Sequence, residues 1–494
     1  MPELSRRRRF LVLAICSASI LVVVMDISIV NVALPAIGRD LHASVSGLQW
    51  TVDAYTLVLA SFLVLAGSTA DRVGRRPVFQ AGLAAFGLGS LLCSLAPGIG
   101  WLIAARALQA AGGTMLNPVA MSIVANTFPD QAERARAIGV FGSVSGLALA
   151  LGPILGGVLV DSVGWRAIFW VNVPIVAAAI TCSAVFVPAS RAARARRFDP
   201  AGQAMMVVVL GSVIYAIIES GRLGWTSPVI LGLLAVAVLG VLGIIGYERR
   251  RADPLLELRL FRSVPFSAAI LMALLALCGF GAFLFVTTLY LQDARGMSAL
   301  GAGLCLLPVG GLTVALAPLS GRLVGRRGPR RPLVAAGAAL ALGGGVSIWL
   351  GPATPLPAVL AAYLLFGVFL GTVNPPVTST AVSGMPRSMA GVAASLASAG
   401  RQTGTSLGVA ISGVIVGPAL ARGAAAFTSA AQSVWWLVLG LGVGIGVLGL
   451  LSTGRRALAT AGRAAALFEG MDRGAGLGAA AVPGPAGRAA PGRG

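Results

Sequence analysis

The sequence predicts an all-α integral membrane protein, because its composition, the length of its apolar runs and the placement of its charges all favour this class. Hydrophobic residues make up 57% of the 494 residues and charged residues only 11%, and the mean hydropathy is +0.90. The apolar runs are about 18 to 25 residues long, the length that an α-helix needs to cross about 30 Å of hydrocarbon. A transmembrane β-barrel would instead show alternating apolar and polar residues.

Fourteen such runs follow one another between short joints that contain arginine, glycine or proline. The first begins at Phe10 and continues to Pro35. It is longer and more polar at its end than the core of a cleaved signal peptide, so we expect an uncleaved span. The expected spans are 10–35, 47–70, 77–96, 101–125, 136–160, 165–187, 203–220, 228–247, 265–292, 299–320, 332–351, 356–381, 390–417 and 433–452.

The arginines predict the orientation of these spans. All 37 basic residues are arginine, and if the N-terminus lies in the cytoplasm, most of them fall in cytoplasmic segments. The opposite face then carries only Arg39, Arg166, Arg222, Arg295 and Arg422. Because cytoplasmic segments are enriched in basic residues, we expect both termini in the cytoplasm. The formal charge of +21 then needs no nucleic-acid partner.

Several chemistries are excluded by residue types that are missing or scattered. Without lysine there is no Walker A phosphate loop and no Schiff base for pyridoxal phosphate, so we expect no ATP use and no cofactor. His42 is the single histidine, and the cysteines lie within apolar runs without a CxxC pair, at Cys16, Cys93, Cys182, Cys278 and Cys305. We therefore expect no metal site and no disulfide framework. No joint is long enough for a catalytic domain, so an enzyme is not expected.

Two joints of the chain are alike. One runs from Gly67 to Arg76 after the second span, and the other runs from Gly321 to Arg330 after the tenth. At a constant offset, two glycines and two arginines of the first joint meet identical residues, whereas Asp71 meets Gly325. The shared joint predicts a duplicated bundle, and the spacing leaves room for two extra spans between the halves.

Four motifs resemble those of the major facilitator superfamily, a family of transporters. The joint 67–76 looks like its signature loop, and Arg106-Ala-Leu-Gln109-Ala-Ala-Gly112 is similar to its Arg-x-x-Gln-Gly-x-Gly motif in span 4. The segment from Gly146 to Gly157 resembles the antiporter motif of span 5, and the segment 25–35 resembles the span 1 motif of the fourteen-span drug:proton antiporters. The likeness covers residues 10–452. Ala110 departs from the usual glycine, and Gly325 removes the carboxylate from the second loop.

The resemblance implies a major facilitator fold of two six-helix bundles plus two extra transmembrane helices. We therefore expect a cytoplasmic N-terminus at 1–9, an N-terminal bundle at 10–187 and a linker with the two additional helices at 188–264. The C-terminal bundle is expected at 265–452. The tail at 453–494 is rich in alanine, glycine, proline and arginine, a composition that favours disorder because it buries little apolar surface.

The antiporter motif comprises Gly146, Gly152, Pro153, Gly156 and Gly157. Proline deletes a helical hydrogen bond and kinks the span, while small residues four apart let another helix approach closely. Helix packing alone explains this pattern. The resemblance implies instead a contact that seals the two bundles against each other.

The loop after span 2 also has two interpretations. Its residues of interest are Gly67, Asp71, Arg72, Gly74, Arg75 and Arg76. They fit topology charges that flank a membrane. The resemblance implies a conformational latch, made when the cytoplasmic side is closed and broken when it opens.

Three charged residues lie within spans at one expected depth. At about 1.5 Å per residue, Asp26, Asp53 and Arg106 all fall in the outer third of the membrane core. An unpaired charge there costs about 2.5 to 3.5 kcal/mol, so we expect them to face each other or a wet cavity. One guanidinium neutralises only one of the two carboxylates, which leaves the other to take up a proton. A purely structural ion pair is the alternative. Of the two carboxylates, Asp53 is favoured as the proton carrier and Asp26 as a carrier or a contact for a cationic substrate, although the two roles are exchangeable.

Aromatic, amide and guanidinium side chains of the spans are candidates for a substrate cavity, although packing explains most such residues in any bundle. They are Trp50, Tyr55, Gln109, Asn117, Tyr290, Gln292, Asn374, Arg401 and Gln402.

The resemblance implies a proton-coupled antiporter that exports amphiphilic drugs or antibiotics by alternating access. We expect it in the cytoplasmic membrane of a bacterium, acting as a monomer on protons and small molecules. The alternative on the same fold is a dedicated exporter or facilitator of a single metabolite or lipid.

Overall fold

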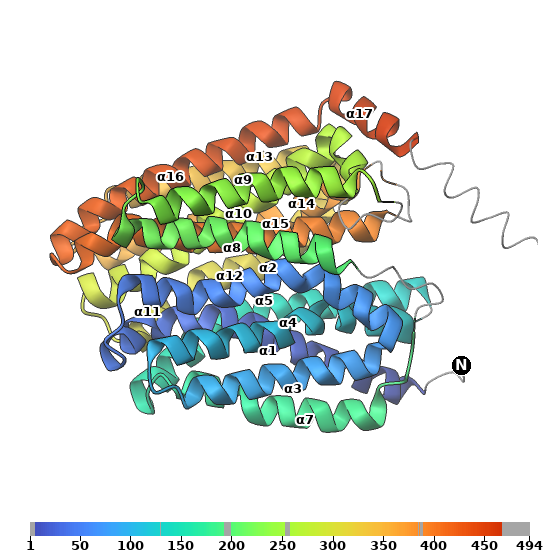
Figure 1. Cartoon of the computed structure of the whole chain (residues 1–494), viewed down its shortest axis with the longest axis horizontal. Coiled ribbons are helices and arrows are strands. Elements are labelled where there is room, and N and C mark those ends of the chain that lie inside the picture. Colours follow the sequence, from blue (N-terminus) through green and yellow to red (C-terminus); the bar gives the residue numbers. More distant parts are fainter. Residues whose placement is uncertain are drawn as a thin grey trace, which may run out of the picture.

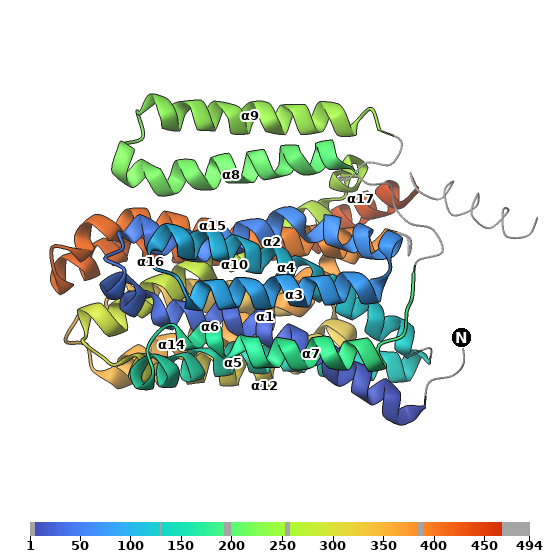
Figure 2. The same ribbon diagram turned by 60° about the horizontal axis from the view of Figure 1, so that its bottom comes forward.

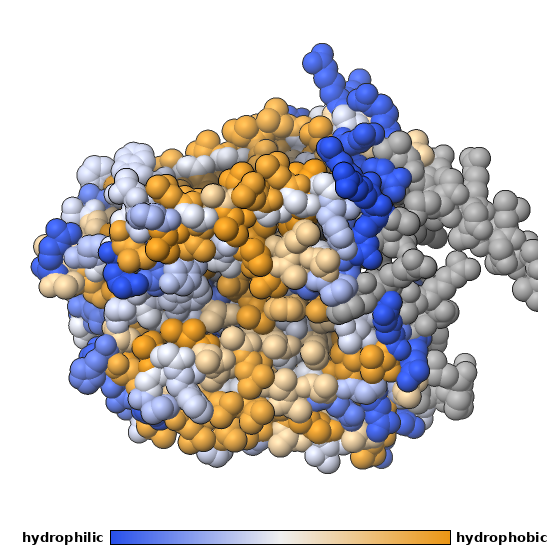
Figure 3. All heavy atoms as spheres, in the orientation of Figure 1, coloured by the Kyte–Doolittle hydropathy of each residue, from blue (hydrophilic) through white to orange (hydrophobic). Residues whose placement is uncertain are grey.

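The computed structural model describes residues 5–128, 130–191, 199–251, 257–383, 385 and 389–466, and every regular element among them is helical (Figure 1). The chain forms two bundles that lie side by side, with the first half in blue to teal and the second in yellow to red. The start of α1 and helix α17 lie at the same end of the molecule, which we call the terminal end. Figure 3 shows apolar side chains over the middle of one face and hydrophilic ones at its two ends.

The first half and the extra pair follow the predicted order. The first half consists of α1 (Arg6–Asp40), α2 (Val45–Val73), α3 (Arg75–Ser94), α4 (Ile99–Thr127), α5 (Gln131–Ser162), α6 (Ala167–Trp170) and α7 (Asn172–Phe186). The extra pair is α8 (Pro200–Leu223) and α9 (Pro228–Glu248), each begun by a proline in its first turn, where the missing N–H costs nothing. Figure 2 shows this pair as a hairpin on the outside of the molecule, with α8 facing the bundles.

The second half has more breaks than the sequence predicts. It consists of the 3₁₀ turn η1 (Leu258–Arg262), α10 (Val264–Leu289), the π turn η2 (Tyr290–Ala294), α11 (Ala299–Cys305), α12 (Leu307–Arg327), α13 (Arg330–Ser347), α14 (Leu356–Val382), α15 (Ala390–Leu420) and α16 (Ala424–Ser452). The expected span 299–320 is divided at Leu306, because Pro308 in the first turn of α12 cannot donate the bond that would continue α11.

Length and apolar composition identify eleven described helical segments that could cross a membrane. A twelfth is α2, if its two parts, bent by 53°, form one span. Helices α4 and α13 are outside this set: α4 carries arginine and amides, and α13 begins with two arginines. The protein is thus a multi-pass membrane protein, whereas the predicted count of fourteen is not confirmed.

The predicted disorder of the tail is wrong for its first part. Residues Arg455–Ala466 form helix α17. Its alanines Ala457, Ala461 and Ala464 are buried, and Thr460 Oγ1 accepts a hydrogen bond of 2.9 Å from the backbone N–H of Val264. A stripe of small residues was enough to dock this helix, and its leucine, Leu458, is 49% exposed. The remainder of the tail, 467–494, lies outside the described residues, as do 192–198 and 252–256 of the predicted linker.

The hydrophobic core joins the two halves at the end of the molecule opposite the terminal end. One buried cluster contains Ile29, Leu34 and Phe169 of the first half together with Phe283 and Val309 of the second. A second cluster belongs to the first half alone and fills it toward the terminal end. The halves are therefore packed together through the side of the molecule where α1 ends and α2 begins.

Candidate functional site

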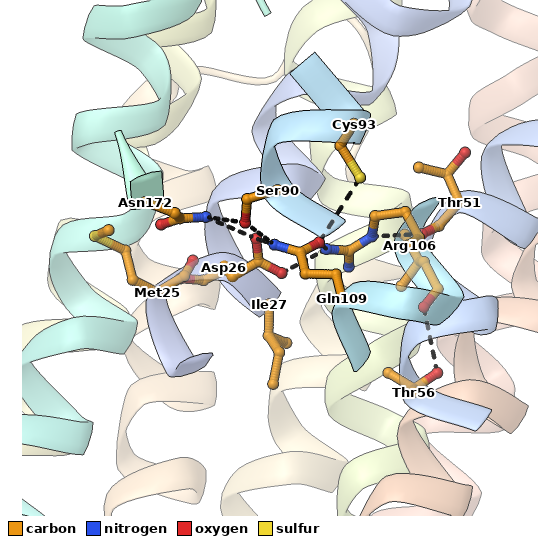
Figure 4. Close-up of polar contacts among 12 residues, drawn as sticks. Met25, Asp26, Ile27, Thr51, Thr56, Ser90, Cys93, Arg106, Gln109 and Asn172 are labelled. Atoms are coloured by element: carbon orange, nitrogen blue, oxygen red, sulfur yellow. Dashed lines mark hydrogen bonds and ion pairs between the residues drawn. The ribbon is translucent and has the colours of Figure 1, made fainter. Parts of the chain in front are cut away.

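A buried ion pair lies at the centre of the first half (Figure 4). Asp26 of α1 is 0% exposed and Arg106 of α4 is 1% exposed, and Arg106 Nη1 lies 2.5 Å from Asp26 Oδ2. Taking these charges out of water is costly, and close geometry with further hydrogen bonds is needed to offset that cost. The pairing of Arg106 with one of the two predicted carboxylates is thus observed.

Amide and hydroxyl groups from α3, α4 and α7 complete the environment of Asp26 (Figure 4). Gln109 Nε2 donates to Asp26 Oδ1 at 2.8 Å and to Ser90 Oγ at 2.7 Å. Asn172 Nδ2 donates to Asp26 Oδ1 at 3.3 Å. Helices α1, α4 and α7 therefore meet at this carboxylate, and α3 joins them through Ser90. Ser90 and Asn172 were not predicted, because a single serine or asparagine in an apolar run carries no sign of its partner.

The guanidinium of Arg106 has further partners on α2. Its Nε donates to the carbonyl oxygen of Thr51 at 3.1 Å. Its carbon lies 4.2 Å from the centre of the Tyr55 ring, a distance at which the ring attracts a cation. Tyr55 and Gln109 therefore belong to the ion-pair cluster rather than standing alone as cavity residues.

Asp53 does not join this cluster. Residues two apart on an α-helix are rotated by about 200° around the helix axis. Thr51 lies on the side of α2 that faces Arg106, so Asp53 lies on the side that faces the second half. Asp53 is 0% exposed, and its Oδ1 accepts hydrogen bonds from Ser406 Oγ of α15 at 2.8 Å and from Thr56 Oγ1 at 3.4 Å. No described group donates to its Oδ2. Our expectation that the three charges converge is therefore wrong for Asp53, because equal depth does not mean an equal face.

The contact around Asp53 is a closed seam between α2 and α15. One turn before Asp53, Gln49 Nε2 donates to the carbonyl oxygens of Ala410 at 2.7 Å and Val409 at 3.3 Å. A methyl group added to Gly413 would lie 2.4 Å from the Gln49 amide nitrogen, so a larger residue there would displace the Gln49 side chain. The two halves are thus in direct contact beside the buried carboxyl group.

Helix α8 covers this seam from outside, because it packs on both α2 and α15 (Figure 2). Trp50 Nε1 donates to Glu219 Oε1 at 3.2 Å, and the Trp50 and Tyr215 rings lie 5.6 Å apart. Arg222 Nε donates to the other oxygen of Glu219 at 3.0 Å. Trp50, predicted as a cavity residue, instead connects the first half to the extra hairpin.

Replacing Trp50 with phenylalanine should lower the free energy of unfolding by about 1 kcal/mol, because it removes one partly buried hydrogen bond to a carboxylate while keeping most of the ring contact. Unfolding of the purified protein in mixed micelles measures this change. Trp436→Phe is the control, since that side chain is 60% exposed. An equal loss in both variants would contradict a docking role for Trp50.

The antiporter motif on α5 contacts two partners. Within the first half, added methyl groups at Gly152 and Gly156 would lie 3.1 Å from carbonyl oxygens of α1. Toward the second half, a methyl group at Gly157 would lie 2.5 Å from Leu300 Cα of α11, and Gly146 faces Val314 of α12 at 3.4 Å. The two interpretations of this motif thus apply to different glycines. Gly152 and Gly156 pack against a helix of the same half, whereas Gly146 and Gly157 contact the other half.

A carboxylate reinforces the contact between α5 and α11. Asp161 accepts hydrogen bonds from the backbone N–H groups of Ala299 at 3.2 Å and Leu300 at 2.8 Å, so a residue of the first half caps a helix of the second. Nearby, Gln292 Nε2 donates to the carbonyl oxygen of Val32 at 2.8 Å. Asp161 was not predicted, because no motif marked it.

The loop after α2 contacts its own half. Asp71 lies 3.4 Å from Arg75, and the backbone N–H of Arg75 donates to Ser190 at 2.9 Å. Arg76 donates to the carbonyl oxygen of Ala184. Gly74 has a φ of +119°, which favours glycine where α2 turns into α3. A methyl group at Gly67 would meet nothing within 4 Å, so no close approach occurs there in this conformation.

The other predicted cavity residues are dispersed. Tyr290 donates its hydroxyl to Gly351 at 2.8 Å. Arg401 has a buried Nη1 without a described partner. Asn117, Asn374 and Gln402 are half-buried on α4, α14 and α15.

Comparisons with known proteins agree with this architecture. The model of the Major Facilitator Superfamily matches residues 16–409. The chain is 35% identical to the multidrug resistance protein Stp of Mycobacterium tuberculosis (strain ATCC 25618 / H37Rv) over 83% of this chain and 76% of that protein. It is 36% identical to the tetracenomycin C resistance and export protein of Streptomyces glaucescens, with the same coverage.

A solved structure shares the fold. It is a peptide transporter POT in complex with sulfate, with a TM-score of 0.65, 14% sequence identity and coverage of 94% of this chain and 97% of that one. The predicted resemblance is therefore confirmed: the chain belongs to the Major Facilitator Superfamily and is a membrane transporter, not an enzyme.

Proposed function

We propose that this protein exports amphiphilic drugs or antibiotics across the bacterial cytoplasmic membrane in exchange for protons. Relatives that are named for multidrug resistance and for resistance to and export of one antibiotic support drug export. A dedicated exporter of a single compound is the second candidate, because the tetracenomycin C relative is named for one substrate. Competition for transport by unrelated dyes and antibiotics separates the two.

The observation that carries proton coupling is the environment of Asp53. Its carboxyl group is fully buried and lies between the two halves, and among the described residues no arginine pairs with it. Burying a carboxylate without a compensating partner is highly unfavourable, whereas the protonated acid is neutral and can donate a hydrogen bond. Asp53 therefore carries the proton in this conformation. Separation of α2 from α15 removes the Ser406 contact and lets water reach the carboxyl group, so opening of the seam releases the proton.

Asp26 has a different role in this proposal. Arg106, Gln109 and Asn172 all donate hydrogen bonds to it, so its partners lie within the first half. We assign to the Asp26–Arg106 pair the task of holding α1, α4 and α7 together as one rigid half. In this proposal Asp53, and not Asp26, is the proton carrier.

The proposed alternating access rests on contacts that join the two halves at one end of the molecule. Asp161 with α11, Gln292 with Val32 and Gly157 with Leu300 close the end opposite the terminal end. We assign that end to the cell exterior and both termini to the cytoplasm, because the arginines gather at the terminal end. The loop 67–76 then serves as a latch, in which Arg75 contacts Asp71 and Arg76 contacts the carbonyl oxygen of Ala184.

Further elements of the proposal concern the spans and the substrate. We count α4 and α13 with the twelve apolar spans, for a total of fourteen, because α4 packs along α3 and α13 along α14 and α16.

The half-buried Asn117, Asn374 and Gln402 offer polar contacts to a substrate held between the halves, and Arg401 offers a cation. We also propose that the protein acts as a monomer.

Replacing Asp53 with asparagine tests the proposal. In proteoliposomes with an acidic extracellular side, Asp53→Asn should lose the acceleration of export by the pH gradient, because the amide cannot release a proton. Exchange of labelled for unlabelled substrate without a gradient should persist, which shows that the protein is folded. Asp40→Asn is the control, because the Asp40 side chain is 48% exposed. Gradient-driven export by Asp53→Asn at the level of the native protein would refute the assignment.

A further inference from the structure

A cavity lies between the terminal ends of α1 and α5, far from the ion pair and the seam. Its volume is about 130 Å³, and its charged wall consists of Arg6, Arg9, Glu133 and Arg136. Phe10, Leu13 and Val140 form much of the apolar wall. None of these residues takes part in the proposed exchange of substrate and proton, so the cavity needs its own explanation.

The charged wall has more positive than negative charge. Arg9 Nη1 lies 2.5 Å from Glu133 Oε2, and no other described carboxylate pairs with Arg6 or Arg136, so two guanidinium charges stay unmatched. Arg9 Nε is buried and has no hydrogen-bond partner among the described residues. Helices α1 (Arg6–Asp40) and α5 (Gln131–Ser162) both begin beside the cavity, so the positive ends of two helix dipoles add to the field. The wall is therefore suited to an anion.

The apolar wall opens outward rather than into the protein. Phe10 is 53% exposed and Val140 is 48% exposed, whereas Leu13 is buried at 6%. Phe10 begins the apolar part of α1, directly after the arginines, so the cavity lies where hydrocarbon meets the headgroup region. A ligand here touches guanidinium groups at one end and lipid-facing side chains at the other.

We propose that this cavity binds an anionic glycerophospholipid. The guanidinium groups of Arg6, Arg9 and Arg136 hold its phosphodiester, and an acyl chain lies along Phe10 and Val140. Planar guanidinium groups bind phosphate oxygens through paired hydrogen bonds, and basic pockets between membrane helices recognise acidic headgroups. A free phosphate ion uses only the charged wall, and the exposed apolar wall is what favours a lipid. The bound lipid connects α1 to α5, the two helices that also contact α11 or η2 at the opposite end.

Native mass spectrometry of the purified full chain tests this site. We titrate phosphatidylglycerol and phosphatidylcholine with identical acyl chains, and glycerol 3-phosphate as the soluble headgroup. One phosphatidylglycerol should bind at least about tenfold more tightly than either of the others. The triple variant R6Q/R9Q/R136Q should lose this preference. Glu133→Gln should strengthen phosphatidylglycerol binding, because it removes the single carboxylate from the wall and frees Arg9.

The triple variant R249Q/R250Q/R262Q is the matched control, since it removes three exposed arginines at the same end of the molecule. It should retain the preference for phosphatidylglycerol. Equal binding of the two lipids by the native protein overturns the proposal, and so does a preference that survives R6Q/R9Q/R136Q. Glycerol 3-phosphate binding as tightly as phosphatidylglycerol shows a site for free anions and also overturns it. If R6Q/R9Q/R136Q does not fold, Glu133→Gln decides the question. It should strengthen phosphatidylglycerol binding, and unchanged or weaker binding overturns the proposal.

Discussion

Replacing Arg106 with glutamine is expected to lower the free energy of unfolding by about 3 to 5 kcal/mol, the cost of breaking a buried ion pair from one side. The variant leaves the Asp26 carboxylate, which is 0% exposed, with amide partners but no cation. It also removes the contacts of the guanidinium with Thr51 and with the Tyr55 ring. Denaturant unfolding of the purified protein in mixed micelles measures the change.

A second substitution separates the charge from the packing. The double variant Asp26→Asn with Arg106→Gln should recover more than half of the loss, because two neutral amides no longer leave a buried charge unpaired. Arg166→Gln is the matched control. Its guanidinium lies 2.6 Å from Asp40, but the two side chains are 43% and 48% exposed, so the expected loss is below about 1 kcal/mol. A loss at Arg106 no greater than at Arg166 would show that the buried pair has no special importance.

Apolar runs of membrane length predicted most of the helices, whereas α4 and α13 are not apolar enough to be identified as spans in this way. Asp26 and Arg106 could also be predicted to meet, because charged groups at the same depth of a membrane bundle have few other ways to be satisfied, whereas Gln109 was expected only as a cavity residue. Their motifs also resembled those of the family. The helix breaks were less predictable. Pro308 ends α11 inside a continuous apolar run, and small residues docked α17 without an apolar signal.

The depth of the charged side chains in the membrane could be predicted, but the side of the helix on which each one lies could not. Counting along a helix gives the level of Asp53, whereas its partner depends on the rotation of α2, which places Thr51 toward Arg106 and Asp53 toward Ser406. Likewise, Asn172 and Ser90 complete the network around Asp26 from helices that are distant in sequence. Partners of this kind are set by how helices pack, and a single sequence does not contain that information.

Replacing Gly157 with valine is expected to abolish transport while leaving each half folded. The added Cβ would lie 2.5 Å from Leu300 Cα and 2.7 Å from the Ala299 carbonyl oxygen. Backbone atoms cannot yield as a flexible side chain does, so α5 and α11 must move apart. This contact joins the two halves. The clash therefore prevents closure of the end opposite the terminal end and leaves the core of each bundle intact.

The matched control lies on the same helix. A methyl group at Gly142 meets nothing within 4 Å, so Gly142→Val should transport normally. Transport in proteoliposomes and labelling of an Ala299→Cys reporter by an impermeant maleimide give independent readouts, because Ala299 is 4% exposed in the closed contact. Gly157→Val should raise labelling as it lowers transport, since a carrier that cannot close one end cannot alternate between its two sides. Normal transport by Gly157→Val would mean that the tight contact between α5 and α11 is not needed in the cycle, and the role assigned to the end of the antiporter motif would then be wrong.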